Sequence, residues 1–282
     1  MPTTQHRSSD AGSPPPHPDL PRGSRRLSVA GWVGLVIGYL VLLQGLAWVL
    51  TRGRESRYGS PTSVDELWRS ITVPVACSVA LIVVVVGVLR WDRPVWTDRR
   101  PVQRWVAVVP VAMLLAVVAA TDYAGLADRG VVFSLLLLAS TLLVGFGEEL
   151  MFRGVGLTVF RSNGFSEGKA ALWSTVVFGS AHATNLVSSG PGAYVQVFVA
   201  ALSGYFLYLV RRRSGGLLLP ALVHGLWDFS LISGSVVPDR VHPGVAVNVL
   251  VIVVLAVLLV VRRHRIEPRP APVPVPSQEE IR

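Results

Sequence analysis

The sequence predicts an all-α membrane protein, a polytopic bundle of about eight transmembrane helices. Apolar residues make up 51% of the 282 residues, and charged residues make up only 15%. An ordinary soluble domain carries about 25% charged residues. The apolar residues are also gathered in long blocks, which is typical of helices that cross a bilayer. These observations favour a membrane protein over one or two soluble domains of the same total length.

The helices are predicted from apolar blocks that approach roughly 20 residues, the length needed to span a bilayer. Eight candidates follow one another along the chain: residues 29–50, 71–89, 105–121, 131–151, 170–187, 193–210, 216–233 and 244–261. The first makes about 33 Å of helix, and it begins too far from residue 1 for a cleaved signal peptide. The fourth can continue to about residue 161, which places Glu148 and Glu149 near the middle of a long helix.

The distribution of arginine and lysine predicts that both ends of the chain face the cytoplasm. The loops expected on the cytoplasmic side carry Arg22, Arg25, Arg26, Arg90, Arg93, Arg99, Arg100, Arg104, Arg161, Lys169, Arg211, Arg212, Arg213, Arg262, Arg263, Arg265 and Arg269. The other loops carry Arg52, Arg54, Arg57, Arg69, Arg129 and Arg240. The loop at 51–70 fits least well because it holds four of these arginines, although Glu55, Asp65 and Glu66 accompany them.

The chain divides into a membrane part and two tails. We expect a disordered cytoplasmic tail at 1–28, N-terminal transmembrane helices at 29–125, a central core at 131–232, a last transmembrane helix at 244–262 and a proline-rich tail at 263–282. The tails contain the stretches SPPPHP and EPRPAPVPVP. Polar, proline-rich segments of this kind bury too little apolar surface to fold.

Two features of the composition exclude other classes of protein. The net charge of +9 is typical of nucleic-acid binding, but the arginines lie between apolar blocks and not along one face. We therefore interpret them as topology signals and expect no nucleic-acid partner. The single cysteine, Cys77, lies in an apolar run and excludes an intrachain disulfide.

Ionisable side chains within the predicted helices are confined to three of them. The first, second, third, sixth and eighth candidates contain none, and the others contain Glu148, Glu149, Arg153, His182, His224 and Asp228. A charge near the centre of a bilayer costs at least about 2.5–3.5 kcal/mol. We therefore expect these six side chains to face the interior of the bundle and one another.

Helical spacing groups these residues into short polar stripes. Glu149 and Arg153 are four residues apart with the glutamate first, which favours an ion pair. Glu148 points about 100° away from Glu149 and is free for another task. His182 lies four residues after Phe178, and Asp228 lies four residues after His224. Each of these pairs therefore also shares a helix face.

The residue types indicate two chemical routes to hydrolysis. Glu148, His182 and His224 match a three-ligand zinc site that leaves one position open for water. The same residues also match a water activated directly by a glutamate, with a histidine sharing its proton. Either route produces a nucleophilic hydroxide and favours hydrolysis of an acyl bond, most plausibly a peptide bond. The sequence contains no HExxH, which excludes a zincin-type site, and no serine triad suggests itself.

Each residue also has a structural interpretation, and two other functions stay open. Arg153 alone is typical of a topology charge, and His182 or His224 alone is typical of a hydrogen-bonded core histidine. A proton or ion relay is an alternative because chains of glutamate and histidine also mark ion paths. A non-proteolytic binding protein, as in bacteriocin self-immunity, is another. Clustering of the ionisable residues favours a site over a path, which distributes them along the membrane depth.

Three stretches together resemble a known family. EELMFRG, FGSAH and HGLWD are similar in order and spacing to the EExxxR, FxxxH and HxxxN/D motifs of the CPBP family. These are intramembrane proteases related to the CAAX prenyl endopeptidases, with bacteriocin-processing and self-immunity members. The resemblance covers about 131–232. It implies an all-helical membrane metalloprotease whose site opens toward the cytoplasm, with a divalent metal, zinc, as the expected cofactor.

The resemblance also implies a role for each site residue. Glu148 would be the base that activates water, assisted by His182, while Glu149 and Arg153 complete the first motif. His224 and Asp228 would form the oxyanion or ligand end. Aspartate stands at 228 where the prenyl-protein members carry asparagine. Because aspartate lacks an amide donor, it would instead bind a metal or orient the histidine.

The expected partners are a peptide or membrane-protein substrate and the lipid bilayer. The chain uses arginine almost to the exclusion of lysine, with Lys169 as its one lysine. This preference is typical of a GC-rich bacterial genome, so we expect a multi-pass protein of the bacterial plasma membrane. Prenylated CAAX proteins are then not expected as substrates.

Overall fold

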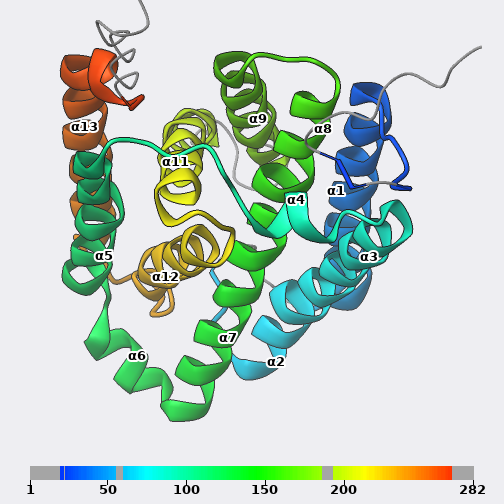
Figure 1. The fold of residues 1–282 in the computed structure, drawn as a ribbon. Coiled ribbons are helices and arrows are strands. Elements are labelled where there is room, and N and C mark those ends of the chain that lie inside the picture. The colour runs from blue at the N-terminus through cyan, green and yellow to red at the C-terminus, as the bar shows by residue number, and fades with distance from the viewer. Residues whose placement is uncertain (1–19, 22, 55–59, 186–192, 269–282) are drawn as a thin grey trace, which may run out of the picture.

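The computed structural model describes residues 20–21, 23–54, 60–185 and 193–268. Within these ranges the regular elements are helices, and the only β-type pairing is an isolated bridge between Thr97 and Gly216. The predicted all-α class is confirmed (Figure 1). Most of the two predicted tails lies outside the described residues.

The helices follow one another along the chain with short connections. The α-helices are α1 (Val29–Thr51), α2 (Val64–Leu67), α3 (Val73–Leu89), α4 (Asp92–Trp96), α5 (Val108–Ala120), α6 (Tyr123–Arg129), α7 (Val131–Glu148), α8 (Leu157–Ser162), α9 (Glu167–Ala181), α11 (Ala193–Ser214), α12 (Leu218–Ser233) and α13 (Gly244–Arg262). Two π-helices, η1 (Trp68–Thr72) and η3 (Glu149–Gly156), continue α2 into α3 and α7 into α8. The 3₁₀-helices are η2 (Arg104–Ala107), η4 (His182–Asn185) and η6 (Arg263–Arg265).

Several of these helices are long and apolar enough to cross a membrane. Among the described residues they are Val29–Thr51, Val64–Leu89, Val131–Ser162, Tyr194–Ser214 and Gly244–Arg265. The pair Arg104–Ala120 and Tyr123–Arg129, bent by 56°, makes a sixth if it is counted as one span. The protein is therefore a polytopic helical membrane protein, and the long extension predicted for the fourth candidate is confirmed.

The fifth and seventh predicted spans are helical but short. Helix α9 has 15 residues and α12 has 16. Sixteen residues make about 24 Å of α-helix, less than the roughly 30 Å of a hydrocarbon core. Eight complete crossings, and the orientation of the termini, remain predictions.

Helix α7 runs through the middle of the bundle and packs along α12 (Figure 1). The two backbones approach closely where Gly145 faces Gly225. A Cβ atom on Gly145 would lie 2.4 Å from the nitrogen of Gly225, and one on Gly225 would lie 2.6 Å from the Cα of Leu142. Small residues permit such close helix contacts in membranes. This contact brings the glutamates at the end of α7 against His224 of α12.

Other helices enclose this central pair. Helices α5 and α13 pack together and against α12 on one side, and α1 and α3 pack together on the other side, where α3 contacts α7 (Figure 1). Helices α9 and α11 pair through Gly179, whose Cβ position is 2.7 Å from the Cβ of Ala201. The outer faces remain apolar: on α13 alone, the exposed side chains that do not line the large cavity include Leu250, Val253, Val254, Val257, Val260 and Val261. An exposed apolar face of this extent suits contact with lipid.

Candidate active site

The continuous run from α7 to α8 is interrupted by the π-helix η3. All eight of its residues are buried. Two side chains from other helices bind its backbone: Trp32 Nε1 donates to the carbonyl of Met151 at 3.3 Å, and Ser174 Oγ donates to the carbonyl of Phe152 at 3.0 Å. Single-turn π segments inside α-helices are frequent at functional sites. Here the segment begins at Glu149 and carries Arg153.

Glu149 and Arg153 form the ion pair predicted from their spacing. Arg153 Nη1 lies 2.6 Å from Glu149 Oε1, and both side chains are 0% exposed. The Arg153 guanidinium also lies over the ring of Phe178, with Cζ 4.0 Å from the ring centroid. A glycine at position 204 leaves room for it, because a Cβ atom there would lie 2.6 Å from Arg153 Nη2.

His224 connects this ion pair to two further carboxylates. Its Nδ1 lies 3.0 Å from Glu149 Oε1, within hydrogen-bonding distance. Its Nε2 lies 3.6 Å from Glu148 Oε2 and 3.7 Å from Asp228 Oδ2. The bond to Glu149 fixes the ring orientation, so that the other nitrogen faces Glu148 and Asp228.

Glu148 points away from the ion pair, as its helical position predicts. Its side chain is 16% exposed and lines a cavity of about 510 Å³, whereas Glu149 does not line it. Within the described parts of the chain, Glu148 Oε2 is buried and has no hydrogen-bond partner. A buried carboxylate oxygen without a partner is costly, which makes this atom the one least explained by stability alone.

His182 reaches the same cavity from the end of α9. Its Nδ1 lies 3.0 Å from the carbonyl oxygen of Phe178, and its ring meets the Phe178 ring edge-on with 4.8 Å between centroids. If the ring is neutral, a proton on Nδ1 leaves Nε2 as an acceptor. His182 contacts neither Glu148 nor His224 directly through a hydrogen bond or ion pair within the described structure. The cavity is what joins them.

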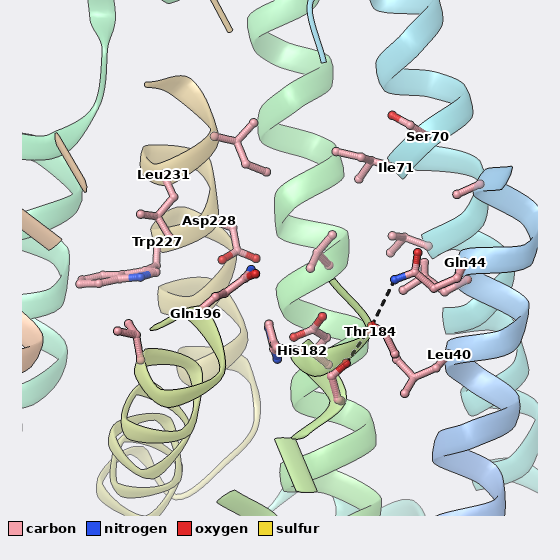
Figure 2. A pocket seen from close by; sticks show the side chains of 18 of the residues that line it. Leu40, Gln44, Ser70, Ile71, His182, Thr184, Gln196, Trp227, Asp228 and Leu231 are labelled. Atoms are coloured by element: carbon pink, nitrogen blue, oxygen red, sulfur yellow. Dashed lines mark hydrogen bonds between the residues drawn. The ribbon is translucent and has the colours of Figure 1, made fainter. Parts of the chain in front are cut away.

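The cavity has the size of a small-molecule or peptide pocket. Figure 2 shows His182, Gln196 and Asp228 near its middle, with Trp227 and Leu231 on one side. The wall is largely apolar and comes mainly from helices α1, η1, α3, α7, α11, α12 and α13, including Leu40, Leu43, Ile71, Val75, Val144, Val195, Val199, Ile232, Val245 and Val249. A smaller cavity of about 90 Å³ borders His182, His224 and Asp228.

The six residues singled out in the sequence therefore converge. Glu148, Glu149, Arg153, His224 and Asp228 form one chain of contacts no longer than 3.7 Å, and His182 shares a cavity with Glu148 and Asp228. Their roles in a reaction stay predictions, because proximity alone assigns no chemistry.

The predicted zinc ligands do not form a metal site as they stand. No three His, Cys, Asp or Glu side chains within the described residues lie close enough together to hold a metal ion. The Nδ1 atoms of His182 and His224 are both engaged, with the carbonyl of Phe178 and with Glu149. A zinc cofactor therefore remains a prediction.

Two further cavity residues make hydrogen bonds between helices. Gln44 Nε2 lies 3.4 Å from Thr184 Oγ1, and Asn248 Nδ2 lies 3.1 Å from Ser230 Oγ. Figure 2 marks the first of these bonds. Both residues also line the cavity, which their isolated positions on apolar helices could not show.

The comparison with known families now bears on this arrangement. Residues 130–230 match the family described as type II CAAX prenyl endopeptidase Rce1-like. This segment is therefore similar to Rce1-like domains. Its bounds agree with the resemblance drawn from the three motifs, and it contains all six predicted site residues.

The chain is also similar to one curated protein over part of its length. A protein of Escherichia coli, described as an uncharacterized 24.3 kDa protein, is 38% identical over 93 residues. That match covers 32% of this chain and 39% of the relative, so the chain spans about two fifths of its length. No solved structure matches the chain. Helices α1, α3 and α13, which line much of the cavity, lie outside the Rce1-like domain.

Proposed function

We propose that the protein is an intramembrane endopeptidase that hydrolyses a peptide bond with a water molecule activated by Glu148. The observation that supports this most directly is the position of Glu148. It lines the 510 Å³ cavity beside His182 and Asp228, and its Oε2 is buried without a hydrogen-bond partner among the described residues. The Rce1-like domain supports the same class of reaction.

In this proposal Glu148 acts as general base and then as general acid. It takes a proton from a water molecule held between it and His182, and the resulting hydroxide adds to the carbonyl carbon of the substrate. The C–N bond then breaks, and the proton moves from Glu148 to the departing amine nitrogen. One water is consumed, and one carboxyl and one amino group are released.

His224 serves the carbonyl oxygen. Glu149 accepts a hydrogen bond from Nδ1 of His224, and this bond directs Nε2 of the same ring toward the region between Glu148 and Asp228. With a proton on both nitrogens, His224 donates from Nε2 to the oxygen as negative charge develops on it. Asp228 orients the His224 ring from the side of Nε2, opposite Glu149. This role does not need the amide donor of asparagine. Arg153 keeps Glu149 in place and is a positioning residue.

The substrate is an apolar segment of a peptide or membrane protein. The cavity wall is largely apolar, and most of its residues come from helices that are long enough to span a bilayer. We place the protein in the bacterial plasma membrane with the site open toward the cytoplasm, on the basis of its arginine distribution.

Replacement of Glu148 by glutamine tests the proposal. The full-length parent and Glu148→Gln would be purified in detergent and incubated with a library of apolar dodecapeptides, with products identified by mass spectrometry. Loss of a general base costs about 10²–10⁴-fold in rate, so cleavage by the variant should fall at least a hundredfold. The matched control is Asp128→Asn, which neutralises a carboxylate that is 66% exposed on α6 and should leave cleavage unchanged.

Two outcomes would replace the proposal. Cleavage by Glu148→Gln at the parental rate would remove this residue from the mechanism. A parent that cuts no peptide but carries protons across proteoliposomes, with flux abolished in Glu148→Gln, would establish the relay. Zinc is tested separately, as metal content per chain in the parent and in His182→Ala.

A further inference from the structure

A second cavity lies at the far end of α8, away from the candidate active site. It has a volume of about 270 Å³ and shares no lining residue with the larger cavity. Four of its lining residues are arginines, and they are Arg93, Arg99, Arg100 and Arg161. The rest of the wall is Leu20, Pro21, Pro94, Thr97, Asp98 and Thr158. A concentration of guanidinium groups around a hollow suits an anionic ligand.

The backbone that presents these arginines is held rigidly. The fully buried Arg211 donates from Nη1 to the carbonyl of Val95 at 2.8 Å and from Nη2 to the carbonyls of Pro94 and Thr97 at 3.0 and 3.1 Å. The amide of Asp98 donates to the carbonyl of Gly215 at 2.8 Å. Residues 93–100 are therefore fixed against the end of α11, and the cavity is a built feature of the fold.

The acidic groups near the cavity are already engaged. Asp98 Oδ2 is shared by Arg161 at 3.0 Å and Arg211 at 3.3 Å. Glu167 pairs with both Arg161 and Arg100. Arg93 and Arg99 line the cavity and are exposed, and their guanidinium groups form no ion pair or hydrogen bond with any other described residue.

The cavity also lies at the end of a helical run long enough to cross a membrane, where lipid headgroups are expected. Thr158 and Arg161 belong to the last turns of the membrane-length run Val131–Ser162. Its loops are among those that the arginine distribution places on the cytoplasmic side, where anionic lipids are concentrated. Guanidinium groups bind phosphate through two parallel hydrogen bonds, and basic pockets at this depth bind phosphorylated headgroups.

We propose that this cavity binds the phosphate of an anionic phospholipid headgroup, with Arg93 and Arg99 as its principal ligands. The apolar side chains of Leu20, Pro21 and Pro94 lie where the phosphate meets the less polar part of the lipid. The bound lipid anchors the end of α8 and is separate from peptide hydrolysis, so the inference does not depend on the proposed function.

Native mass spectrometry of the full-length protein in detergent tests this site. The probes are phosphatidylglycerol and phosphatidylcholine with identical acyl chains. The parent should retain phosphatidylglycerol about tenfold more strongly than phosphatidylcholine. The double variant Arg93→Gln with Arg99→Gln should retain the two lipids equally. The control, Arg213→Gln with Arg265→Gln, removes the same charge from exposed residues on the same side and should retain the parental preference.

Three results would overturn the proposal. Equal loss in both double variants would assign the preference to general surface charge and not to the cavity. Equal retention of the two lipids by the parent would remove the headgroup site. Displacement of phosphatidylglycerol by inorganic phosphate, together with direct phosphate adducts on the parent alone, would identify free phosphate as the ligand. Thermal unfolding of each variant, together with the single variant Arg99→Gln, distinguishes lost binding from lost folding.

Discussion

Two groups of charges in this molecule, each containing a fully buried arginine, differ in how completely their polar atoms are hydrogen-bonded. The first is the candidate active site around Glu148, His182 and His224. The second, which we term the charge network, joins the end of α8 to α9 and α11 and comprises Asp98, Arg100, Arg161, Glu167, Tyr208, Arg211, Arg212 and Glu267. The difference between the two groups distinguishes charges that stabilise the fold from charges that are available for chemistry.

The two fully buried arginines show the contrast. Arg211 uses all three of its guanidinium nitrogens, in bonds to Asp98 and to the carbonyls of residues 94, 95 and 97. Arg153 uses only Nη1, and its Nε and Nη2 are buried without hydrogen-bond partners within the described structure. The same holds for one oxygen each of Glu148 and Glu149. Buried polar groups without hydrogen-bond partners lower the stability of the fold. The candidate active site therefore contributes less to stability than the charge network does.

The largest expected effect is on stability, in the charge network. Arg211→Gln leaves the carboxylate of Asp98 and three backbone carbonyls without their buried partner. Breaking a buried ion pair from one side costs about 3–5 kcal/mol. Thermal unfolding in detergent should show this loss, whereas Arg213→Gln, an exposed neighbour, should change the free energy of unfolding by less than about 0.5 kcal/mol.

The same measurement on Glu148→Gln sharpens the comparison. It removes a buried charge that has no hydrogen-bond partner for one oxygen, so stability should be unchanged or higher while cleavage is lost. The distinction between the two groups would fail if Glu148→Gln unfolded as readily as Arg211→Gln.

An intermediate effect is expected from acid titration of the network. Burial alone raises the pKa of Glu167, but the hydrogen bond and charge of Arg161, the hydroxyl of Tyr208 and the charge of Arg100 outweigh it and lower the pKa to about 2. A carboxyl whose pKa is lower in the folded state contributes stability above its unfolded pKa of 4.5. This contribution, about 1–3 kcal/mol, should disappear as the pH falls from 4.5 toward 2.

Unfolding curves at successive pH values check this contribution. The parent should lose stability through that window, and Glu167→Gln, less stable at pH 7, should lose correspondingly less. Parallel curves for the two proteins would show that the carboxylate of Glu167 does not stabilise the fold through its charge.

Much of the site was predictable because the membrane makes polar residues conspicuous. Glu148, Glu149 and Arg153 stand out in an apolar helix, and the four-residue spacing was enough to predict the ion pair that forms at 2.6 Å. The same spacing separated the two glutamates, since adjacent helical positions point to different faces. The contact of His224 with Glu149 follows from the close approach of Gly145 and Gly225, which no spacing within one helix reveals.

The charge network escaped prediction because its residues look like loop charges. Arg211, Arg212 and Arg213 were interpreted as topology signals, but only Arg213 is exposed, and the first two are 0% and 5% exposed. Asp98, the partner of Arg211, lies in a polar connection between helices, where acids are usually solvated. The π-helix η3 was also not expected, because no local propensity distinguishes a π segment from the α-helix around it.

Substitution of Gly204 tests whether the geometry of the candidate active site is precise although several of its buried atoms lack hydrogen-bond partners. A Cβ atom at this position would lie 2.6 Å from Arg153 Nη2 and 2.8 Å from Phe178 Cδ1, so Gly204→Ala must displace the guanidinium or the ring. Overpacking of this kind costs about 1–3 kcal/mol. The matched control is Gly168→Ala in α9, which meets nothing within 4 Å and should be neutral or stabilising by up to about 1 kcal/mol.

The position of Gly204 beside Arg153 predicts a larger effect on catalysis than on folding. Displacing Arg153 moves Glu149 and, through it, the ring of His224, and a misplacement of about 1 Å costs about a hundredfold in rate. In Gly204→Ala, kcat should therefore fall far more than the folded fraction, with KM nearly unchanged because the residue does not line the cavity. A rate that falls only in proportion to the folded fraction would show that Arg153 and Glu149 belong with the charge network, as structure alone.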